Sequence, residues 1–277
     1  MIENLKIIFD KYKNQKIFQI LNYFLLLLSV YYLWDKLQEF EYSKINLIPN
    51  SAFLFCVFLL LTSFIFQAIG WTKLFDSKIN NYFIKVWLNS NISKYIPFKI
   101  GVIIKRVNDI KLKYQHISAK LITKNYLYEQ FFILITSILI SLGYFVNNIF
   151  LFTLIILIGV IILEILNKST RNLNILSSLS IFLISQLFYL YSLYIISFNV
   201  FGTTSLRFAS FYFISTIIGM FVFTAPTGIG VRESVFLFLL GDSYGLNAVL
   251  SYVVICRILT TIVDVLTFFL SFLFSKK

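Results

Sequence analysis

The stretch TAPTGIGVRE at residues 224–233 lies between two strongly apolar runs of the chain. Proline and glycine interrupt a helix, and in hydrocarbon every freed backbone group needs a partner inside the protein. The adjacent pair Arg232 and Glu233 is equally unsuited to a helix that faces lipid. We therefore expect this stretch to be the turn of a re-entrant helical hairpin that lines a polar cavity.

The composition of the whole chain is that of an integral membrane protein. Of its 277 residues, 59% are hydrophobic and 13% are charged, and the mean hydropathy is +0.85. A soluble domain is about half apolar and a quarter charged. The chain has two cysteines, Cys56 and Cys256, and one histidine, His116. Their spacing is not that of a zinc site. We expect neither a zinc site nor any other cofactor.

Hydropathy predicts an all-α polytopic helical bundle. Apolar runs long enough to cross the bilayer occur at residues 17–34, 52–71, 127–146, 149–166, 175–198 and 246–274. Two interrupted segments, 80–106 and 208–241, are expected to enter the membrane and return to the side they left. This gives six full spans and two re-entrant hairpins, although a plain eight-span count produces a similar hydropathy plot. The chain is expected to be one transmembrane domain, 1–277, without a soluble catalytic domain.

The two interrupted segments share a pattern. YIPFKIGVIIKR at 95–106 and the stretch at 224–233 both contain P-x-x-x-G followed by a basic residue, and the two prolines, Pro97 and Pro226, are 129 positions apart. Each half would hold three spans and one hairpin, so the halves would be antiparallel. Paired Gly/Pro-interrupted segments at corresponding positions are typical of transporters built from inverted repeats. We expect pseudo-repeats at about 17–146 and 149–275.

The basic residues predict the orientation in the cell membrane. With both termini in the cytoplasm, 19 of the 24 Lys and Arg residues lie inside, and only Lys36, Lys44 and Arg207 lie outside. This asymmetry follows the positive-inside rule. The net charge of +12 is thus a topology signal, and no segment is long enough to form a basic soluble face for nucleic acid.

Charged residues inside the apolar segments are candidates for ligand binding, because such residues face protein or water and usually have partners. We expect Glu233 to pair with Arg257, which leaves Arg232 for a phosphate, while Glu129 and Asp264 are candidate proton carriers. The alternative is that Arg232, Glu233, Arg257 and Asp264 only neutralise one another. Glycines that allow positive φ, followed by a helix start, form an anion site in each hairpin. The predicted substrate-binding residues are Pro97, Lys99, Gly101, Lys105, Arg106, Glu129, Pro226, Gly228, Gly230, Arg232, Glu233, Arg257 and Asp264.

At these residues the sequence resembles the lysylphosphatidylglycerol synthase transmembrane family, which includes the flippase domain of the multiple peptide resistance factor. SKYIPFKIGVIIKR followed by YEQ is similar to the first signature of that family, and TAPTGIGVRE with the later Arg257 is similar to the second. Phe98 departs from the pattern, since the family usually has glycine there. The resemblance implies a lipid translocase fold. The aminoacyl-transferase domain of the two-domain synthases is not expected in this chain.

The function predicted from these observations is transport of an anionic lipid or a polyprenyl-phosphate-linked substrate between leaflets, with the headgroup bound between the hairpins. The expected partner is therefore a membrane lipid or lipid-linked sugar, and the chain is not expected to be an enzyme. One alternative is an intramembrane lipid-dependent transferase, with Asp35, Glu39 and Glu41 as its acidic loop. Another is a non-transporting partner subunit of a cell-envelope glycolipid pathway. The oligomeric state stays open, a homodimer included.

Overall fold

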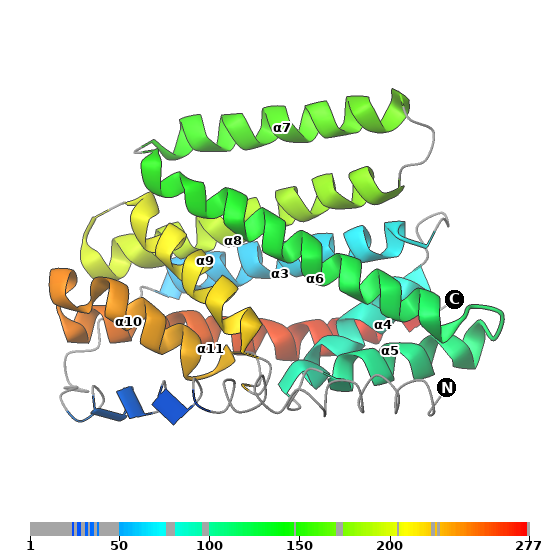
Figure 1. Cartoon of the computed structure of the whole chain (residues 1–277), viewed down its shortest axis with the longest axis horizontal. Helices are drawn as coiled ribbons and strands as arrows, with labels where there is room; N and C mark the ends of the chain where they lie inside the picture. Colours follow the sequence, from blue (N-terminus) through cyan, green and yellow to red (C-terminus); the bar gives the residue numbers. More distant parts are fainter. Residues whose placement is uncertain are drawn as a thin grey trace.

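A computed structural model describes residues 50–75, 81–95, 100–146, 148–169, 174–203, 205–222, 225 and 228–275, together with isolated positions between 24 and 38. These residues form helices and no strand (Figure 1). The fold class is therefore all-α, as predicted. The elements are α3 (Asn50–Lys73), α4 (Asn81–Asn91), η2 (Ile92–Tyr95), α5 (Ile100–Lys113), α6 (Ala119–Ser141), η4 (Leu142–Phe145), α7 (Ile149–Ser169), α8 (Asn174–Phe201), α9 (Leu206–Phe221), α10 (Val231–Tyr244), α11 (Leu246–Ser271) and η6 (Leu273–Ser275).

Five helices are long and apolar enough to cross a membrane: α3, α6 with η4, α7, α8 and α11. They correspond to five of the six predicted spans, which supports a multi-pass membrane protein. The sixth predicted span, 17–34, lies largely outside the described residues. Helix α6 begins earlier than the predicted span at 127, because Ser118 caps it by accepting a hydrogen bond from the Leu121 N–H at 3.2 Å. Its first turns are polar, so hydropathy did not mark them.

The segment at 81–113 is not a continuous helix. Helix α4 ends at Asn91 and α5 begins at Ile100, and the two run antiparallel. Tyr82, at the start of α4, donates a hydrogen bond of 2.6 Å to the backbone oxygen of Asp109, near the end of α5. Closer to the turn, the Lys105 ammonium donates to the Asn89 side chain at 3.0 Å. We call α4, η2 and α5 the first hairpin.

The segment at 206–244 is also broken into two antiparallel helices, α9 and α10, which we call the second hairpin. The Phe208 and Tyr244 rings, at its open end, lie 4.7 Å apart between centroids. At the turn, Gly228 and Gly230 adopt φ values of +72° and +86°, which residues with a Cβ rarely tolerate. The first helix pair begins at 81 and ends at 113, against the predicted 80–106, and the second spans 206–244, against the predicted 208–241.

Helices α3 and α8 pack antiparallel at the centre of the bundle. Cys56 donates to the Ser192 backbone oxygen (3.7 Å), Ser63 and Ser185 share a hydrogen bond (3.4 Å), and Ser178 donates to the Gly70 backbone oxygen (2.6 Å). From one contact to the next, the residue number on α3 rises by seven and the residue number on α8 falls by seven, which shows that the two helices run antiparallel. Small residues at this interface let the backbones approach closely, which is how helices associate in lipid.

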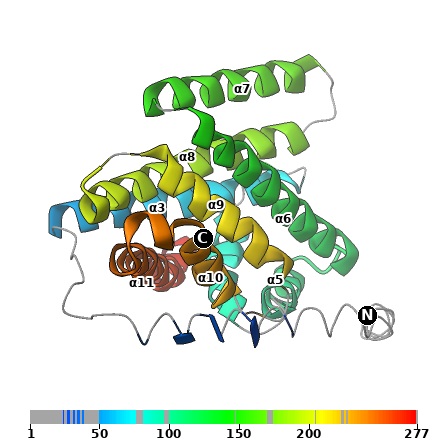
Figure 2. The same ribbon diagram turned by 60° about the vertical axis from the view of Figure 1, so that its left-hand side comes forward.

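Each hairpin packs against the long helix that follows the other hairpin. Helix α4 of the first hairpin contacts α11, and α9 of the second hairpin contacts α6. The turned view in Figure 2 shows α10 beside α11, with α6 alongside α9. Helix α7 lies apart, packed mainly on α8, and most of its apolar side chains are exposed (Figure 1). This arrangement brings η2 of the first hairpin and the start of α10 in the second to one shared cavity.

Candidate functional site

A cavity of about 190 Å³ lies between the two hairpins. Side chains from both hairpins and from α3, α6, α8 and α11 line it. Its described charged lining is Lys94, Arg106, Arg232 and Arg257 against Glu129 and Asp264. Ordinary small-molecule pockets occupy about 300–1,000 Å³. The cavity is therefore large enough only for a small polar group, such as the headgroup of a larger molecule.

The first hairpin is tied to α6 by a buried ion pair. Arg106 binds Glu129 through both terminal guanidinium nitrogens, and the two side chains are 2% and 3% exposed. Trp87 donates its indole N–H to the same carboxylate at 2.8 Å, while the Arg106 Nε donates to Ser90 at 2.9 Å. The guanidinium also lies over the Trp71 ring, 4.6 Å from its centroid. Removing either partner of such a pair leaves a buried charge, so the pair fixes the hairpin turn relative to α6.

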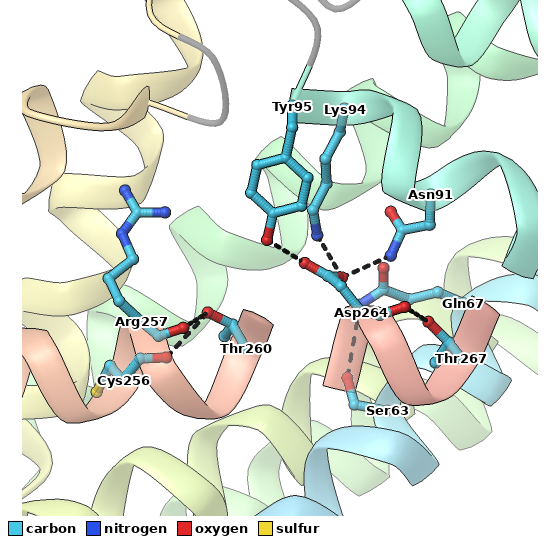
Figure 3. A network of polar contacts seen from close by, with 10 residues as sticks. All are labelled: Ser63, Gln67, Asn91, Lys94, Tyr95, Cys256, Arg257, Thr260, Asp264 and Thr267. Carbon is cyan, nitrogen blue, oxygen red and sulfur yellow. Dashed lines mark hydrogen bonds and ion pairs between the residues drawn. The ribbon is translucent and has the colours of Figure 1, made fainter. Parts of the chain in front are cut away.

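Asp264 gathers three donors from the end of α4 and from η2 (Figure 3). Lys94 forms an ion pair with Oδ1 at 2.7 Å, Asn91 donates to the same oxygen at 2.9 Å, and Tyr95 donates to Oδ2 at 2.6 Å. The carboxylate is almost fully buried, at 1% exposure. We call these four residues the Asp264 cluster. It joins the first hairpin to the last helix, so Asp264 does not pair with Arg232, Glu233 or Arg257.

Glu233 has two roles at the start of α10. One carboxylate oxygen forms an ion pair with Arg257 on α11, and the other accepts the backbone N–H of Gly230 at 2.8 Å. The second contact caps the helix, because the first N–H groups of a helix have no partner within it. The expected Glu233–Arg257 pair is thus present. It is less buried than Arg106–Glu129, with side-chain exposures of 14% and 24%.

Arg232 lies in a slot formed by two glycines. A Cβ atom built on Gly219 would lie 2.7 Å from the Arg232 Cγ, and one built on Gly228 would lie 3.1 Å from its Nε. Glycine at positions 219 and 228 therefore leaves room for the Arg232 side chain, which any larger residue would crowd. Its Nε is buried and has no hydrogen-bond partner among the described residues. The slot thus holds a cationic side chain at the cavity with at least one unused donor.

The structure separates the predicted site residues into groups. Arg106, Glu129, Arg232, Arg257 and Asp264 line the central cavity, Glu233 binds Arg257 just behind it, and Gly228 and Gly230 form the adjoining turn. Gly101 and Lys105 line a different, more open groove on the first hairpin, beside Asp109. Pro97, Lys99 and Pro226 lie outside the described residues.

Several cavity residues were not among the predicted ligands: Gln67, Asn91, Tyr95, Ser137 and Thr216. Gly219, which forms the Arg232 slot, was not predicted either. Lys94 and Tyr95 were noted only as part of the family signature. A lysine within an interrupted apolar segment is a usable signal, and so is a glycine one turn before a helix break. Hydroxyl and amide groups inside apolar helices carry no such signal, because they can bond to their own helix.

The geometry contains no obvious metal centre, since no group of three His, Cys, Asp or Glu side chains in the described part of the chain could hold an ion. What the cavity does offer is an excess of cationic donors. Comparison with protein-family models, with curated proteins and with solved structures gave no match to this chain.

Proposed function

We propose that this chain is a membrane transporter that moves an anionic lipid, or a polyprenyl-phosphate-linked substrate, between leaflets. The observation that carries the proposal is the cavity shared by the two hairpins. Its described lining has four basic and two acidic side chains. With Glu233 added as the partner of Arg257, the formal charge of the set is +1. Ionisable groups inside a membrane mark substrate pathways by default.

The size of the cavity supports a headgroup as the transported part. About 190 Å³ accommodates a polar headgroup but not a whole lipid. The tails would stay in the bilayer while the headgroup passes through the protein. The resemblance of the hairpin stretches to the lysylphosphatidylglycerol synthase transmembrane family favours the same class of substrate, a phospholipid or a lipid-linked phosphate.

The packing of α3 on α8 supports transport by two inverted repeats. Pro97 and Pro226 are 129 residues apart. If the two halves are aligned with this offset, Cys56 corresponds to Ser185 and Ser63 corresponds to Ser192. The contact between Cys56 and Ser192 then becomes the contact between Ser185 and Ser63. Equivalent helices that cross at a pseudo-two-fold axis have this relation, as does any antiparallel pair with contacts seven residues apart. Because the helices are antiparallel, the two halves would have opposite orientations in the membrane.

The ion pairs suggest how access could alternate. In each half a hairpin residue pairs with the following long helix: Arg106 with Glu129, and Glu233 with Arg257. Only the first hairpin is also tied to the other half by an ion pair in the described structure, through Lys94 and Asp264. We infer that this conformation has the first hairpin closed on α11. Transport would require the Asp264 cluster to open.

The direct test is a leaflet-specific assay with purified protein in liposomes. Fluorescent phosphatidylglycerol is distributed over both leaflets, and dithionite added outside reduces only the label it reaches. Wild-type protein should allow almost complete reduction, whereas empty liposomes should stop near half. Arg232→Ala should behave like empty liposomes. The matched control is Arg207→Ala, because Arg207 lies on the same hairpin but is exposed and outside the cavity.

No exchange by folded wild-type protein, with this lipid or with a polyprenyl-phosphate-linked probe, would contradict the proposal. Exchange by Arg232→Ala at the wild-type rate would contradict the assignment of the cavity as the headgroup path.

A further inference from the structure

Seven buried side-chain nitrogen or oxygen atoms in the described part of the chain have no hydrogen-bond partner. Four of them belong to residues that line the central cavity: Ser137 Oγ, Thr216 Oγ1, Arg232 Nε and Arg257 Nη2. Buried polar groups in native proteins are normally paired, so each exception needs an explanation. A cluster of exceptions around one cavity is explained by a ligand that supplies the missing acceptors.

The four donors come from four helices of the cavity lining, each of which packs on the next. Ser137 is on α6, Thr216 on α9, Arg232 on α10 and Arg257 on α11, and α6 contacts α9, α9 contacts α10, and α10 contacts α11. Thr216 lies three residues before Gly219, so it is on the face of α9 that Arg232 crosses. Ser137 is 1% exposed. Figure 3 shows the Arg257 guanidinium projecting from the same face of α11 as Asp264.

The three other buried atoms that lack a hydrogen-bond partner among the described residues belong to residues outside the cavity lining. Trp71, Ser192 and Ser210 have unpaired atoms but do not line the cavity. The guanidinium of Arg106 lies over the Trp71 ring, 4.6 Å from its centroid. Hydroxyls elsewhere in the same helices do find partners: Thr136 donates to Phe132 at 2.7 Å and Ser215 donates to Tyr212 at 2.8 Å. Ser137 and Thr216, each next to one of these, do not.

We propose, on the basis of the transport function proposed above, that these four donors form a subsite for the phosphate of a phosphodiester. Two guanidinium N–H groups and two hydroxyls match the several acceptor oxygens of a phosphate. The lining with Glu233 has a formal charge of +1, which one phosphodiester anion neutralises. A phosphomonoester dianion would leave an excess negative charge. Arg257 therefore serves two purposes, holding Glu233 through Nε and the phosphate through Nη2.

The subsite can be tested without disturbing the fold, because two of its donors have no protein partner to lose. The test variant is Ser137→Ala combined with Thr216→Val. The control variant is Thr136→Val combined with Ser215→Ala, which changes the adjacent buried hydroxyls that lie outside the cavity. Binding is followed by tryptophan fluorescence in detergent, since Trp87 lines the cavity and the chain has three tryptophans. The probes are didecanoyl-phosphatidylglycerol, didecanoylglycerol and inorganic phosphate.

We expect wild type and control to bind didecanoyl-phosphatidylglycerol alike, and the test variant to bind it at least about tenfold more weakly, since a hydrogen bond to a charged group typically contributes that much. Didecanoylglycerol, which lacks the phosphate, should bind at least about tenfold more weakly to wild type. Equal affinity of the test and control variants for the phospholipid would overturn the subsite, and so would equal affinity of wild type for the two lipids.

Failure of the subsite and failure of the transport function give different results. If the test variant loses binding and wild type does not exchange lipid in liposomes, the subsite is supported and the transport function is wrong. If the test variant exchanges lipid and binds it like the control, transport is supported and the subsite is wrong. If inorganic phosphate binds wild type as tightly as the phospholipid does, and the test variant weakens both, the four donors bind phosphate but the phosphodiester assignment is wrong.

Discussion

Substitution of Gly219 by alanine should impair transport by displacing Arg232, which sits between two glycines. The new Cβ would lie 2.7 Å from the Arg232 Cγ and 3.3 Å from its Nε. The Arg232 Nε also lies beside Gly228, where a Cβ would be only 3.1 Å away, so the slot is narrow on that side too. We expect the side chain to shift out of the slot.

The size of the effect follows from the geometry. Ordinary contact of a Cβ begins at 3.4 Å, so the Arg232 Cγ must move by at least about 0.7 Å. Overpacking of this kind costs about 1–3 kcal/mol, and the better helix propensity of alanine returns about 0.5–1 kcal/mol. The net loss of stability should be at most about 2.5 kcal/mol. A misplacement near 1 Å lowers the rate of a positioned reaction by up to about 100-fold, and we expect transport to fall about 10- to 100-fold.

The measurement is the dithionite assay with fluorescent phosphatidylglycerol, together with thermal unfolding of the purified protein. Gly241→Ala is the matched control. Gly241 is a helical glycine on the same hairpin, and a Cβ built there meets no atom within 4 Å. It should transport like wild type and be slightly more stable. If Gly219→Ala transports at the wild-type rate while well folded, Arg232 does not need its slot and the reasoning fails.

Three further predictions concern the charges and the topology. Glu129→Gln should keep an acceptor for the neighbouring indole but strand the Arg106 charge, lowering the free energy of unfolding by about 3–5 kcal/mol in a denaturant titration; a loss below about 1 kcal/mol would contradict the buried pair. Arg232→Lys should fold normally and recover little of the transport lost in Arg232→Ala, because an ammonium lacks the planar fork that a phosphate binds; full recovery in liposomes would argue against direct phosphate contact. In a background free of cysteine, a single cysteine at Lys44 should react with an impermeant reagent from outside, and one at Lys113 only after the membrane is opened; the reverse pattern would invert the topology.

The helix breaks between α4 and α5 and between α9 and α10 were predictable, because residue types near each break disfavour a helix. Pro97 and the stretch from Pro226 to Gly230 disfavour a continuous helix, so a break near each followed from residue types alone. Gly101 is not part of the break, because it lies inside α5. The Glu233–Arg257 pair was also within reach. Adjacent side chains on a helix point about 100° apart, so Arg232 and Glu233 could not share one partner, and the last helix carried the complementary charge.

The Asp264 cluster could not be predicted, because its members are brought together by the tertiary fold. Lys94 and Asp264 are 170 positions apart. Arg232 on α10 and Arg257 on α11 are much closer to Asp264 in the sequence, so they were the partners that the sequence suggested. Gly219 was overlooked for a related reason: its importance depends on which side chain crosses it, and that side chain is on another helix. The polar beginning of α6 was missed because hydropathy detects the membrane, whereas the end of a helix is set by capping.

The antiparallel contacts between α3 and α8 have a mechanical consequence. Sliding one helix along the other by a single turn, about 5.4 Å, would break all three of the contacts that Ser63, Ser178 and Cys56 make. A tilt about Ser63 would keep its contact with Ser185 but separate the two outer contacts, each seven residues away along α3. The pair therefore resists tilting as well as sliding, and we expect the two helices to move as one body.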